Sequence, residues 1–122
     1  MARIVQVLSV GYDRNLMLSR SLLLRNSGYE VVEAHSRHQA LVLVRSEVID
    51  VVLICHTVPE NEQRALISAV RKQRLKMPIL CMTESDFLSA PIEGSMVVSN
   101  GPAELLGAID SAVATVVALR RS

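Results

Sequence analysis

A thiol, an imidazole and a hydroxyl follow one another where a strongly apolar segment of the chain ends. Cys55, His56 and Thr57 come directly after the run Val51–Ile54. Consecutive apolar residues, mostly β-branched and too few for a helix, are typical of a parallel strand that is covered on both faces. Because ligands gather beyond the carboxyl ends of such strands, we expect any chemistry of this chain to lie around Cys55.

The Cys55 thiol allows two interpretations. A reactive or redox-sensing thiol needs a nearby cation or a helix N-terminus that stabilises the thiolate. His56 is adjacent in sequence, but successive strand residues point to opposite faces, which argues against a Cys–His pair. We therefore favour a buried, structural role for Cys55, and also for Cys81, which lies within a second apolar run. Thiol chemistry at Cys55 is kept as an alternative.

The remaining polar candidates are weaker. His35 and His38 are three residues apart but have no third ligand nearby in the sequence, so we predict no metal site and no cofactor. His56 is interpreted as a loop histidine rather than a pH sensor. The predicted third helix and its exit carry a basic edge without interleaved aromatic residues, so no nucleic-acid partner is expected. This edge is formed by Arg64, Arg71, Lys72, Arg74 and Lys76.

The composition is typical of one domain with an aliphatic core. The 122 residues are 50% hydrophobic but only 2% aromatic, and the net charge of +1 gives no general attraction to nucleic acids or membranes. Arg3 and Gln6 interrupt any segment that resembles a signal peptide, and no apolar run reaches the roughly 18 residues of a membrane span. Two cysteines within apolar runs fit a reducing compartment. We therefore expect a single soluble, cytoplasmic domain over residues 1–122.

Segments with strand character alternate with helical segments along the chain. The expected strands are 3–10, 30–34, 50–55, 79–82 and 96–98. Helices are expected after Asp13, Ser36 and Asn61, each placed to cap a helix N-terminus, and from Pro102 onwards. This order predicts an α/β fold in which helices cover both faces of a parallel sheet. Only twelve residues separate Thr83 from the strand at 96–98, so a fourth helix between the last two strands should be shortened or absent.

Two of the predicted helices are rich in aliphatic residues. The first carries a broad apolar stripe that ends at Gly28, a residue suited to the position after a helix. The stripe is formed by Leu16, Leu18, Leu22, Leu23 and Leu24. The last helix, 102–120, is apolar on nearly all sides, so part of its surface should stay exposed and bind a protein partner or a second copy. The residues predicted to form this interface are Met96, Leu105, Ile109, Val113, Val116 and Val117.

Along nearly its whole length the chain resembles the receiver domain of bacterial response regulators. No single segment is specific, and the resemblance rests on their order and spacing. The matching segments are Val7–Val10, Asn15–Leu16, Ser27–Val32, Ala40–Leu41, Asp50–Ile54 with Pro59, Pro78–Leu80 with Thr83, and Pro102 before Glu104–Leu106. The resemblance implies a flavodoxin-like, doubly wound sheet of five parallel strands in the order 2-1-3-4-5.

The residues that transfer phosphate in this family are replaced here. The aspartate that accepts phosphate from a histidine kinase falls on Cys55, and the acidic pair that holds Mg²⁺ falls on Gly11 and Tyr12. The lysine after strand five falls on Ser99, and the hydroxyl residue remains as Thr83. Mg²⁺ requires oxygen ligands that Gly and Cys side chains do not supply. We therefore expect a pocket that keeps its inherited shape but lacks the charges for metal and phosphate.

The sequence thus predicts a receiver-like signal transduction module of the two-component phosphorelay family, a pseudo-receiver that is not an enzyme. We expect it to act independently of phosphorylation, through contacts of the strand-five and last-helix face with a signalling protein or a second copy. The alternatives are a redox-sensing or reactive thiol at Cys55, and a true phosphorelay receiver with a substitute acceptor such as Thr57 or Ser99. The substitute acceptor is disfavoured because hydroxyl groups form phosphate esters too stable for a relay. Nucleic-acid binding through the basic edge is a further alternative.

Overall fold

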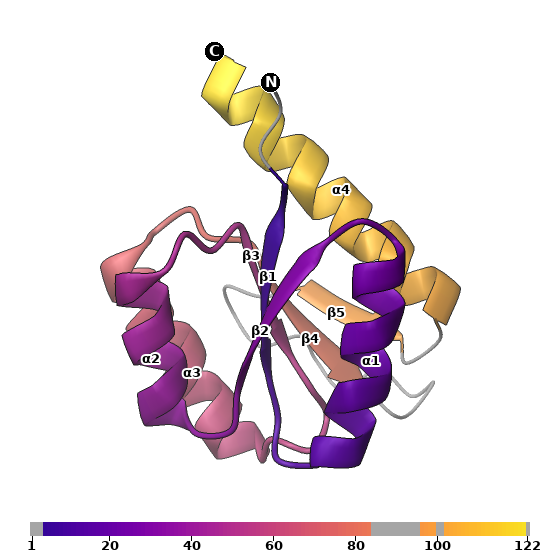
Figure 1. Ribbon diagram of the computed structural model, residues 1–122. Coiled ribbons are helices and arrows are strands. Elements are labelled where there is room, and N and C mark those ends of the chain that lie inside the picture. Colours follow the sequence, from indigo (N-terminus) through magenta and orange to yellow (C-terminus); the bar gives the residue numbers. More distant parts are fainter. Residues whose placement is uncertain (1–3, 84–95, 100–101, 122) are drawn as a thin grey trace.

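Strands and helices alternate along the chain in the computed structural model, which describes residues 4–83, 96–99 and 102–121 (Figure 1). Each described strand and helix corresponds to one that the sequence predicts, and the observed and predicted bounds differ by a few residues at the ends. The strands are β1 (Gln6–Val10), β2 (Glu30–Ala34), β3 (Val51–Ile54), β4 (Ile79–Thr83) and β5 (Met96–Ser99). The helices are α1 (Arg14–Asn26), α2 (Arg37–Ser46), α3 (Glu60–Gln73) and α4 (Pro102–Arg121).

The five strands form one parallel sheet in the order β2-β1-β3-β4-β5, which confirms the predicted strand order. β1 pairs with strands on both of its sides: Val7 is opposite Val31 of β2 and Val51 of β3. β3 is the central strand, as predicted, and its four residues are all buried. Because all strands run the same way, the residues that follow them meet at one edge of the sheet, here called the carboxyl edge. The residues that precede them meet at the opposite, amino edge.

Two hydrophobic layers lie on the two faces of the sheet because successive side chains of each strand point in opposite directions. Leu8 and Val10 of β1 pack with residues of α2 and α3, whereas Val7 packs with residues of α1 and α4. Figure 1 shows the same arrangement, with α2 and α3 on one side of the sheet and α1 and α4 on the other. The sheet, including its carboxyl edge, therefore lies between two hydrophobic cores.

Local sequence chemistry sets two of the helix starts. Asp13 Oδ1 accepts a hydrogen bond from Leu16 N at 3.1 Å, and Ser36 Oγ accepts one from Gln39 N at 3.1 Å, which confirms both predicted caps. Gly28 follows α1 with a φ of +96°, a conformation that side chains with a Cβ rarely adopt.

The predicted cap at Asn61 is wrong. Helix α3 begins two residues earlier than a cap at Asn61 implies, at Glu60 with Pro59 in the N-cap position, and no side chain of the described residues caps it there. Glu60 and Glu62 instead place two negative charges in the first turn, where they favour the positive end of the helix dipole. Asn61 is an exposed residue of this turn.

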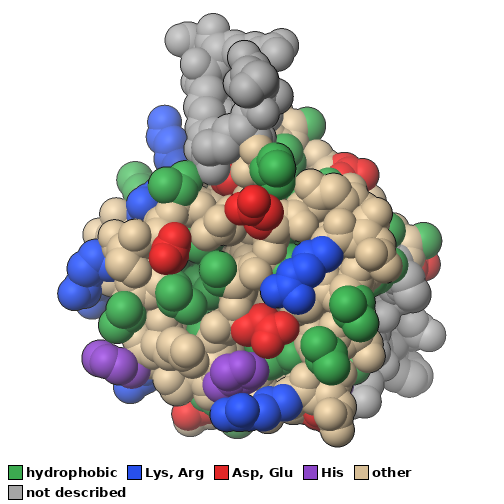
Figure 2. Space-filling model, viewed as in Figure 1, with side chains coloured by type: hydrophobic (Ala, Val, Ile, Leu, Met, Phe, Trp, Pro, Cys, Tyr) green, Lys and Arg blue, Asp and Glu red, His purple; other side chains and the backbone are tan. Residues whose placement is uncertain are grey.

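The apolar stripe predicted for α1 is partly wrong. Leu18 and Leu22 are 54% and 52% exposed. The buried residues are Met17, Arg20, Ser21 and Leu24. A helix turns by 100° per residue, so three consecutive leucines at 22–24 cannot all face the sheet. Figure 2 shows hydrophobic side chains at several separate places on one face of the molecule, interspersed with charged ones.

Helix α4 is anchored by two of the residues predicted to form an interface. Leu105 is 1% and Ile109 0% exposed, and both belong to the core between α1, α4 and the sheet. They are therefore not accessible, because one face of any helix on a sheet must be buried. Val113 is partly buried. The side chains of Met96, Val116 and Val117, and the segment 84–95 with its predicted short or absent helix, lie outside the described residues.

The edge strand β2 is covered by a side chain of α1. Glu30 N bonds to Val5 O and Ala34 O accepts from Gly11 N, so the residues between them at odd positions direct their backbone groups away from β1. Val31 O points outward in this way and accepts a hydrogen bond from Arg25 NH2 at 3.2 Å. Within residues 4–83, 96–99 and 102–121, no helix has the length and apolar character needed to cross a membrane.

The helix caps give a first prediction. Asp13→Ala and Ser36→Ala should each lower the free energy of unfolding by about 1 kcal/mol, because each removes an acceptor from a helix N-terminus. Asn61→Ala is the control and should leave stability unchanged or slightly higher, since Asn61 caps nothing and alanine favours a helix. Urea denaturation followed by circular dichroism measures all three, and a loss at Asn61 equal to that at Asp13 would contradict the assignment.

Candidate functional site

Backbone hydrogen bonds hold the start of the carboxyl edge in line with the sheet. Cys55 N donates to Val10 O at 2.8 Å, and Gly11 N donates to Ala34 O at 3.1 Å. The strand pairing therefore continues one residue beyond β1 and β3. Gly11 and Cys55, which the resemblance assigns to one site, lie side by side at this edge.

The space beside Gly11 is filled by sulfur-containing side chains. A Cβ atom at Gly11 would lie 3.0 Å from Cys55 Cβ, 3.1 Å from Met17 Sδ and 3.3 Å from Cys55 Sγ. Met17 and Cys55 are both 0% exposed. Cys55 and Met17, a residue of α1, therefore occupy the space into which a side chain at Gly11 would point.

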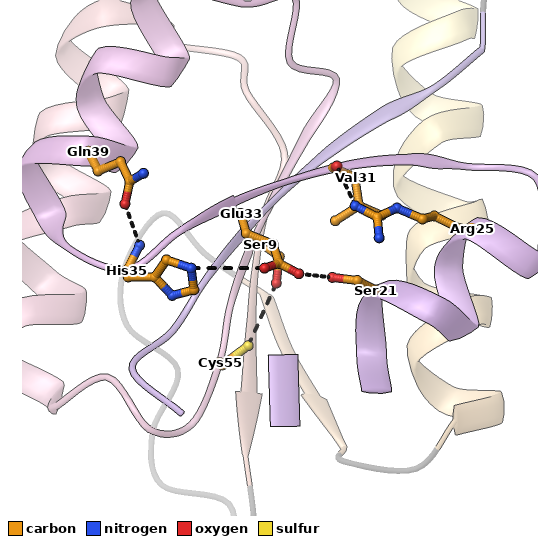
Figure 3. Close-up of polar contacts among 8 residues, drawn as sticks. All are labelled: Ser9, Ser21, Arg25, Val31, Glu33, His35, Gln39 and Cys55. Carbon is orange, nitrogen blue, oxygen red and sulfur yellow. Dashed lines mark hydrogen bonds and ion pairs between the residues drawn. The ribbon is translucent and has the colours of Figure 1, made fainter. Parts of the chain in front are cut away.

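The Cys55 thiol contacts a buried hydroxyl. Its sulfur lies 3.9 Å from Ser9 Oγ, and Ser9 is 0% exposed (Figure 3). Cys81 is also a free thiol and is 5% exposed. Both cysteines are thus buried and unbridged, as predicted.

Polar residues continue from Ser9 across the α1 face of the sheet. Glu33 is opposite Ser9 in the strand register and accepts a hydrogen bond from Ser21 Oγ at 2.5 Å (Figure 3). Its other carboxylate oxygen lies 3.9 Å from His35 Nε2. This group of polar side chains was not predicted from the sequence. The spacing of Ser21 from Met17, four residues, would have placed Ser21 on the buried face of α1.

His56 is bonded to a second buried residue of α1. Arg20 is 6% exposed and its NH2 lies 3.3 Å from His56 Nδ1. His56 therefore has a structural contact in place of the unassigned loop position that the sequence suggested. Arg20 lies three residues after Met17, a spacing that puts both residues on the same face of α1. A charged side chain at this position did not indicate burial.

Tyr12 ties the loop after β1 to the loop and helix after β3. Its backbone N donates to Thr57 Oγ1 at 3.1 Å, and its hydroxyl donates to Glu62 Oε2 at 2.6 Å. This hydrogen bond, partial burial and the negative charge of Glu62 raise the pKa of the Tyr12 hydroxyl, while Arg37 opposes the shift. Tyr12 is thus engaged in a contact between two loops and is 40% exposed.

The other sequence candidates are dispersed. His38 is exposed on α2, whereas the His35 ring lies beside Glu33. The described residues contain no group of three or more His, Cys, Asp or Glu side chains arranged to hold a metal ion. Thr83 and Ser99 are opposite each other in the register of β4 and β5, and their side chains lie outside the described part.

The basic edge on α3 is partly used for internal contacts. Arg64 forms an exposed ion pair with Glu60 at 2.8 Å. Arg71 donates to the carbonyl oxygens of Leu75 and Met77, and burial lowers its pKa. Arg71 is therefore partly buried, and its guanidinium holds the turn between α3 and β4.

The strand order and the helices on both faces define the α/β, flavodoxin-like fold of response regulator receiver domains. A receiver domain from Clostridium thermocellum matches 95% of this chain and 99% of its own, with a TM-score of 0.84 and 21% identity. A putative response regulator from Chloroflexus aurantiacus covers 92% of this chain and 99% of its own, with a TM-score of 0.80 and 26% identity.

The sequence comparisons point the same way over part of the chain. The transcriptional regulatory protein ZraR of Salmonella typhimurium is 32% identical over 89 residues, which are 73% of this chain and 20% of that protein. The chain thus spans about a fifth of the length of the curated relatives it matches. No family model matches the chain.

The filled space at Gly11 gives a second prediction. Gly11→Ala should lower the free energy of unfolding by about 1–3 kcal/mol, because the new Cβ would lie 3.0 Å from Cys55 Cβ, which is attached to the backbone and is not a flexible chain end. Gly107→Ala in α4 is the matched control, since nothing lies within 4 Å of its added Cβ. That change should raise stability by about 0.5–1 kcal/mol. Equal stability of the two variants in urea denaturation would show that the space at Gly11 is open.

The Tyr12 hydroxyl gives a third prediction. In a Tyr29→Phe background, ultraviolet titration should show Tyr12 ionising above the ordinary value of about 10. Glu62→Gln should lower that pKa, whereas Glu60→Gln, whose partner is Arg64, should not. Since the folded pKa is raised, the stability from this bond is fully present below pH 10 or so and is lost as the pH rises through the folded pKa. An unchanged Tyr12 titration in Glu62→Gln would contradict the contact.

Proposed function

We propose that residues 1–122 form one receiver-like signalling module that works by protein–protein contact and does not accept phosphate. The receiver fold and the similarity to a transcriptional regulatory protein support a place in two-component signalling. The module is proposed to act in the cytoplasm, with no cofactor, no nucleic-acid partner and no enzymatic activity of its own.

The packing around Gly11 is the observation that carries this proposal. A receiver that binds Mg²⁺ needs several hard oxygen ligands close together, with room for the ion and its waters. At this carboxyl edge the nearest groups to Gly11 are the Cys55 side chain and the Met17 sulfur. Tyr12 is bound to Glu62. In the proposed pseudo-receiver, side-chain packing thus stabilises the carboxyl edge. A receiver that binds Mg²⁺ would have charged ligands at the same edge.

The two alternatives gain less support. For a reactive thiol, a reagent would have to reach Cys55, which is 0% exposed beneath the loop that contains Gly11. For a substitute acceptor, Thr57 Oγ1 already accepts a hydrogen bond from Tyr12 N. Transfer to Thr57 would break the contact that joins the two loops.

The contact surface remains the β5–α4 face in this proposal. With Leu105 and Ile109 in the core, its accessible apolar part would include Leu106 and Val113, which are partly buried. Val116 and Val117 stay among the residues proposed for this face. A protein of a signalling pathway is the proposed partner. A homodimer through the last helix is the variant of this proposal that needs no second protein.

Phosphodonor labelling tests the proposal. The chain, incubated with radiolabelled acetyl phosphate and Mg²⁺, should incorporate no stoichiometric label. Cys55→Asp should still label poorly, because one carboxylate without a bound cation leaves the phosphate charge uncompensated. A response regulator receiver that accepts phosphate serves as the positive control for the reagent.

Two results would contradict this expectation in different ways. Stoichiometric label in the native chain would end the phosphorylation-independent interpretation. Label that disappears in Thr57→Ala or Ser99→Ala would identify the substitute acceptor and return the chain to the phosphorelay.

A further inference from the structure

The turn between α3 and β4 presents an exposed leucine among positive charges. Leu75 is 77% exposed, the highest value among the large hydrophobic residues that the structure describes. Lys72, Arg74 and Lys76 are exposed as well. Three cations and the leucine thus lie within five consecutive residues. We call this segment, 72–76, the basic turn.

Hydrogen bonds fix the course of the basic turn. Arg74 N donates to Val70 O at 2.7 Å, and Met77 N donates to Arg74 O at 3.3 Å. The Arg71 guanidinium donates to Leu75 O at 3.0 Å and also to Met77 O. Val70 and Met77 are both buried, so the turn is anchored in the core on either side. The backbone of Leu75 is therefore held in place, and its side chain is presented to solvent.

The structure reduces the basic edge expected from the sequence to this turn. Arg64 is paired with Glu60, and Arg71 is used to hold the backbone. Among the residues that the structure describes, the three cations of the basic turn form no ion pair. The cations that are left for another molecule therefore surround Leu75.

The positive charge of the basic turn is local. No aspartate or glutamate occurs in the sequence between Glu62 and Glu84. At the end of the neighbouring helix α2, Arg45 and Glu47 are exposed and have opposite signs. The chain as a whole has a net charge of only +1. The turn is thus a basic patch on a nearly neutral molecule.

The stability of α3 accounts for only part of this pattern. Arg71 and Lys72 lie in the last turn of the helix, where cations favour the negative end of the helix dipole. Arg74 and Lys76 follow the helix, and an exposed leucine between them stabilises neither the helix nor the core. The combination of Leu75 with these two cations therefore points to a contact outside the molecule.

We propose that the basic turn binds the surface of an anionic lipid bilayer, with Leu75 inserted among the headgroups. Such a surface supplies negative charge for the cations and, just below it, an apolar medium for the leucine. A bilayer needs no shaped pocket, so one short turn can engage it. A nucleic acid would neutralise the cations but would give the leucine no apolar environment.

The strength of this contact follows from its few groups. Each cation near an anionic surface favours binding by about fivefold, so three give a preference on the order of 100-fold over a neutral bilayer. Removal of the leucine side chain from water adds roughly tenfold. Binding is therefore reversible. The turn precedes β4 on the α2–α3 side of the sheet, so the carboxyl edge and the β5–α4 face stay free (Figure 1). The proposed function and this contact can each fail alone.

Co-sedimentation with vesicles tests the charges. The native chain should bind phosphatidylcholine vesicles that contain about 30 mol% phosphatidylglycerol at least about tenfold better than pure phosphatidylcholine vesicles. This binding should be lost when salt is raised from about 0.05 M to about 0.5 M. Lys72→Gln, Arg74→Gln and Lys76→Gln should each weaken it about fivefold. Arg64→Gln is the matched control, because it removes the same charge from a residue paired with Glu60, and should change binding by less than about twofold.

A tryptophan probe tests the insertion of the leucine. The chain contains no tryptophan, so Leu75→Trp adds a single fluorescent group. Its emission should shift to shorter wavelength on the anionic vesicles and be quenched by brominated acyl chains, because the ring enters the interface. Leu18→Trp on α1, where Leu18 is 54% exposed, should show neither effect. Leu75→Ser should weaken vesicle binding about tenfold with all charges kept. Circular dichroism shows whether each variant is folded, and all these positions are exposed.

Several results would overturn the membrane contact. Equal binding of the native chain to neutral and anionic vesicles would do so, and so would an unshifted emission of Leu75→Trp. An equal effect of Arg64→Gln and Arg74→Gln would show that only net charge matters. A short DNA duplex that binds at the same salt, weakened by the three glutamine variants but not by Leu75→Ser, would make the turn a nucleic-acid site if the vesicles stay unbound.

Discussion

The close contact between Gly11 and Cys55 is the constraint on which the carboxyl edge depends. It exists because β1 and β3 pair directly and their hydrogen bonding continues one residue past both strands. A Cβ at position 11 would lie 3.0 Å from Cys55 Cβ and 3.1 Å from Met17 Sδ, so a larger residue fits there only if these neighbours shift. The carboxyl edge is therefore closely packed at Gly11, and a charged side chain at this position would disturb that packing. Tyr12, the next residue, is turned outward to Glu62 and joins the loop to α3.

The parts of the fold that could be predicted from the sequence are those fixed by local chemistry or strong patterning. The apolar run Val51–Ile54 predicted a strand buried on both faces, and Asp13 and Ser36 predicted helix starts through their side-chain acceptors. The prediction of a cap at Asn61 failed because any polar side chain near the start of a helix is a possible N-cap. Pro59, two residues earlier, fixes the turn and lets the helix begin before Asn61. Capping preferences thus identify residues that could start a helix, but they do not decide between two such residues that are close together in the sequence.

The features that could not be predicted depend on distances between segments far apart in the sequence. Leucine content gave Leu18 and Leu22 an inward role, while the sheet instead covers Arg20 and Ser21, whose polar groups find His56 and Glu33. A buried Cys55 was predicted, and the resemblance placed it at one site with Gly11. That Met17 also lies beside Gly11 could not be predicted, since Met17 belongs to another element. For the last helix, the pattern identified the apolar residues but did not show which of them face the sheet. Leu105 and Ile109 proved to be core residues.

The hydrogen bond from Arg25 to Val31 O has a consequence for how copies of this chain can meet. An uncovered edge strand presents free backbone groups, which act as a template for strand addition and fibril growth. The Arg25 guanidinium occupies one such acceptor in β2 and adds a charge that a neighbouring backbone would have to desolvate. On this side of the sheet, association by continuous backbone pairing is therefore opposed. Contacts with other molecules are left to side chains, whose chemistry can select a partner.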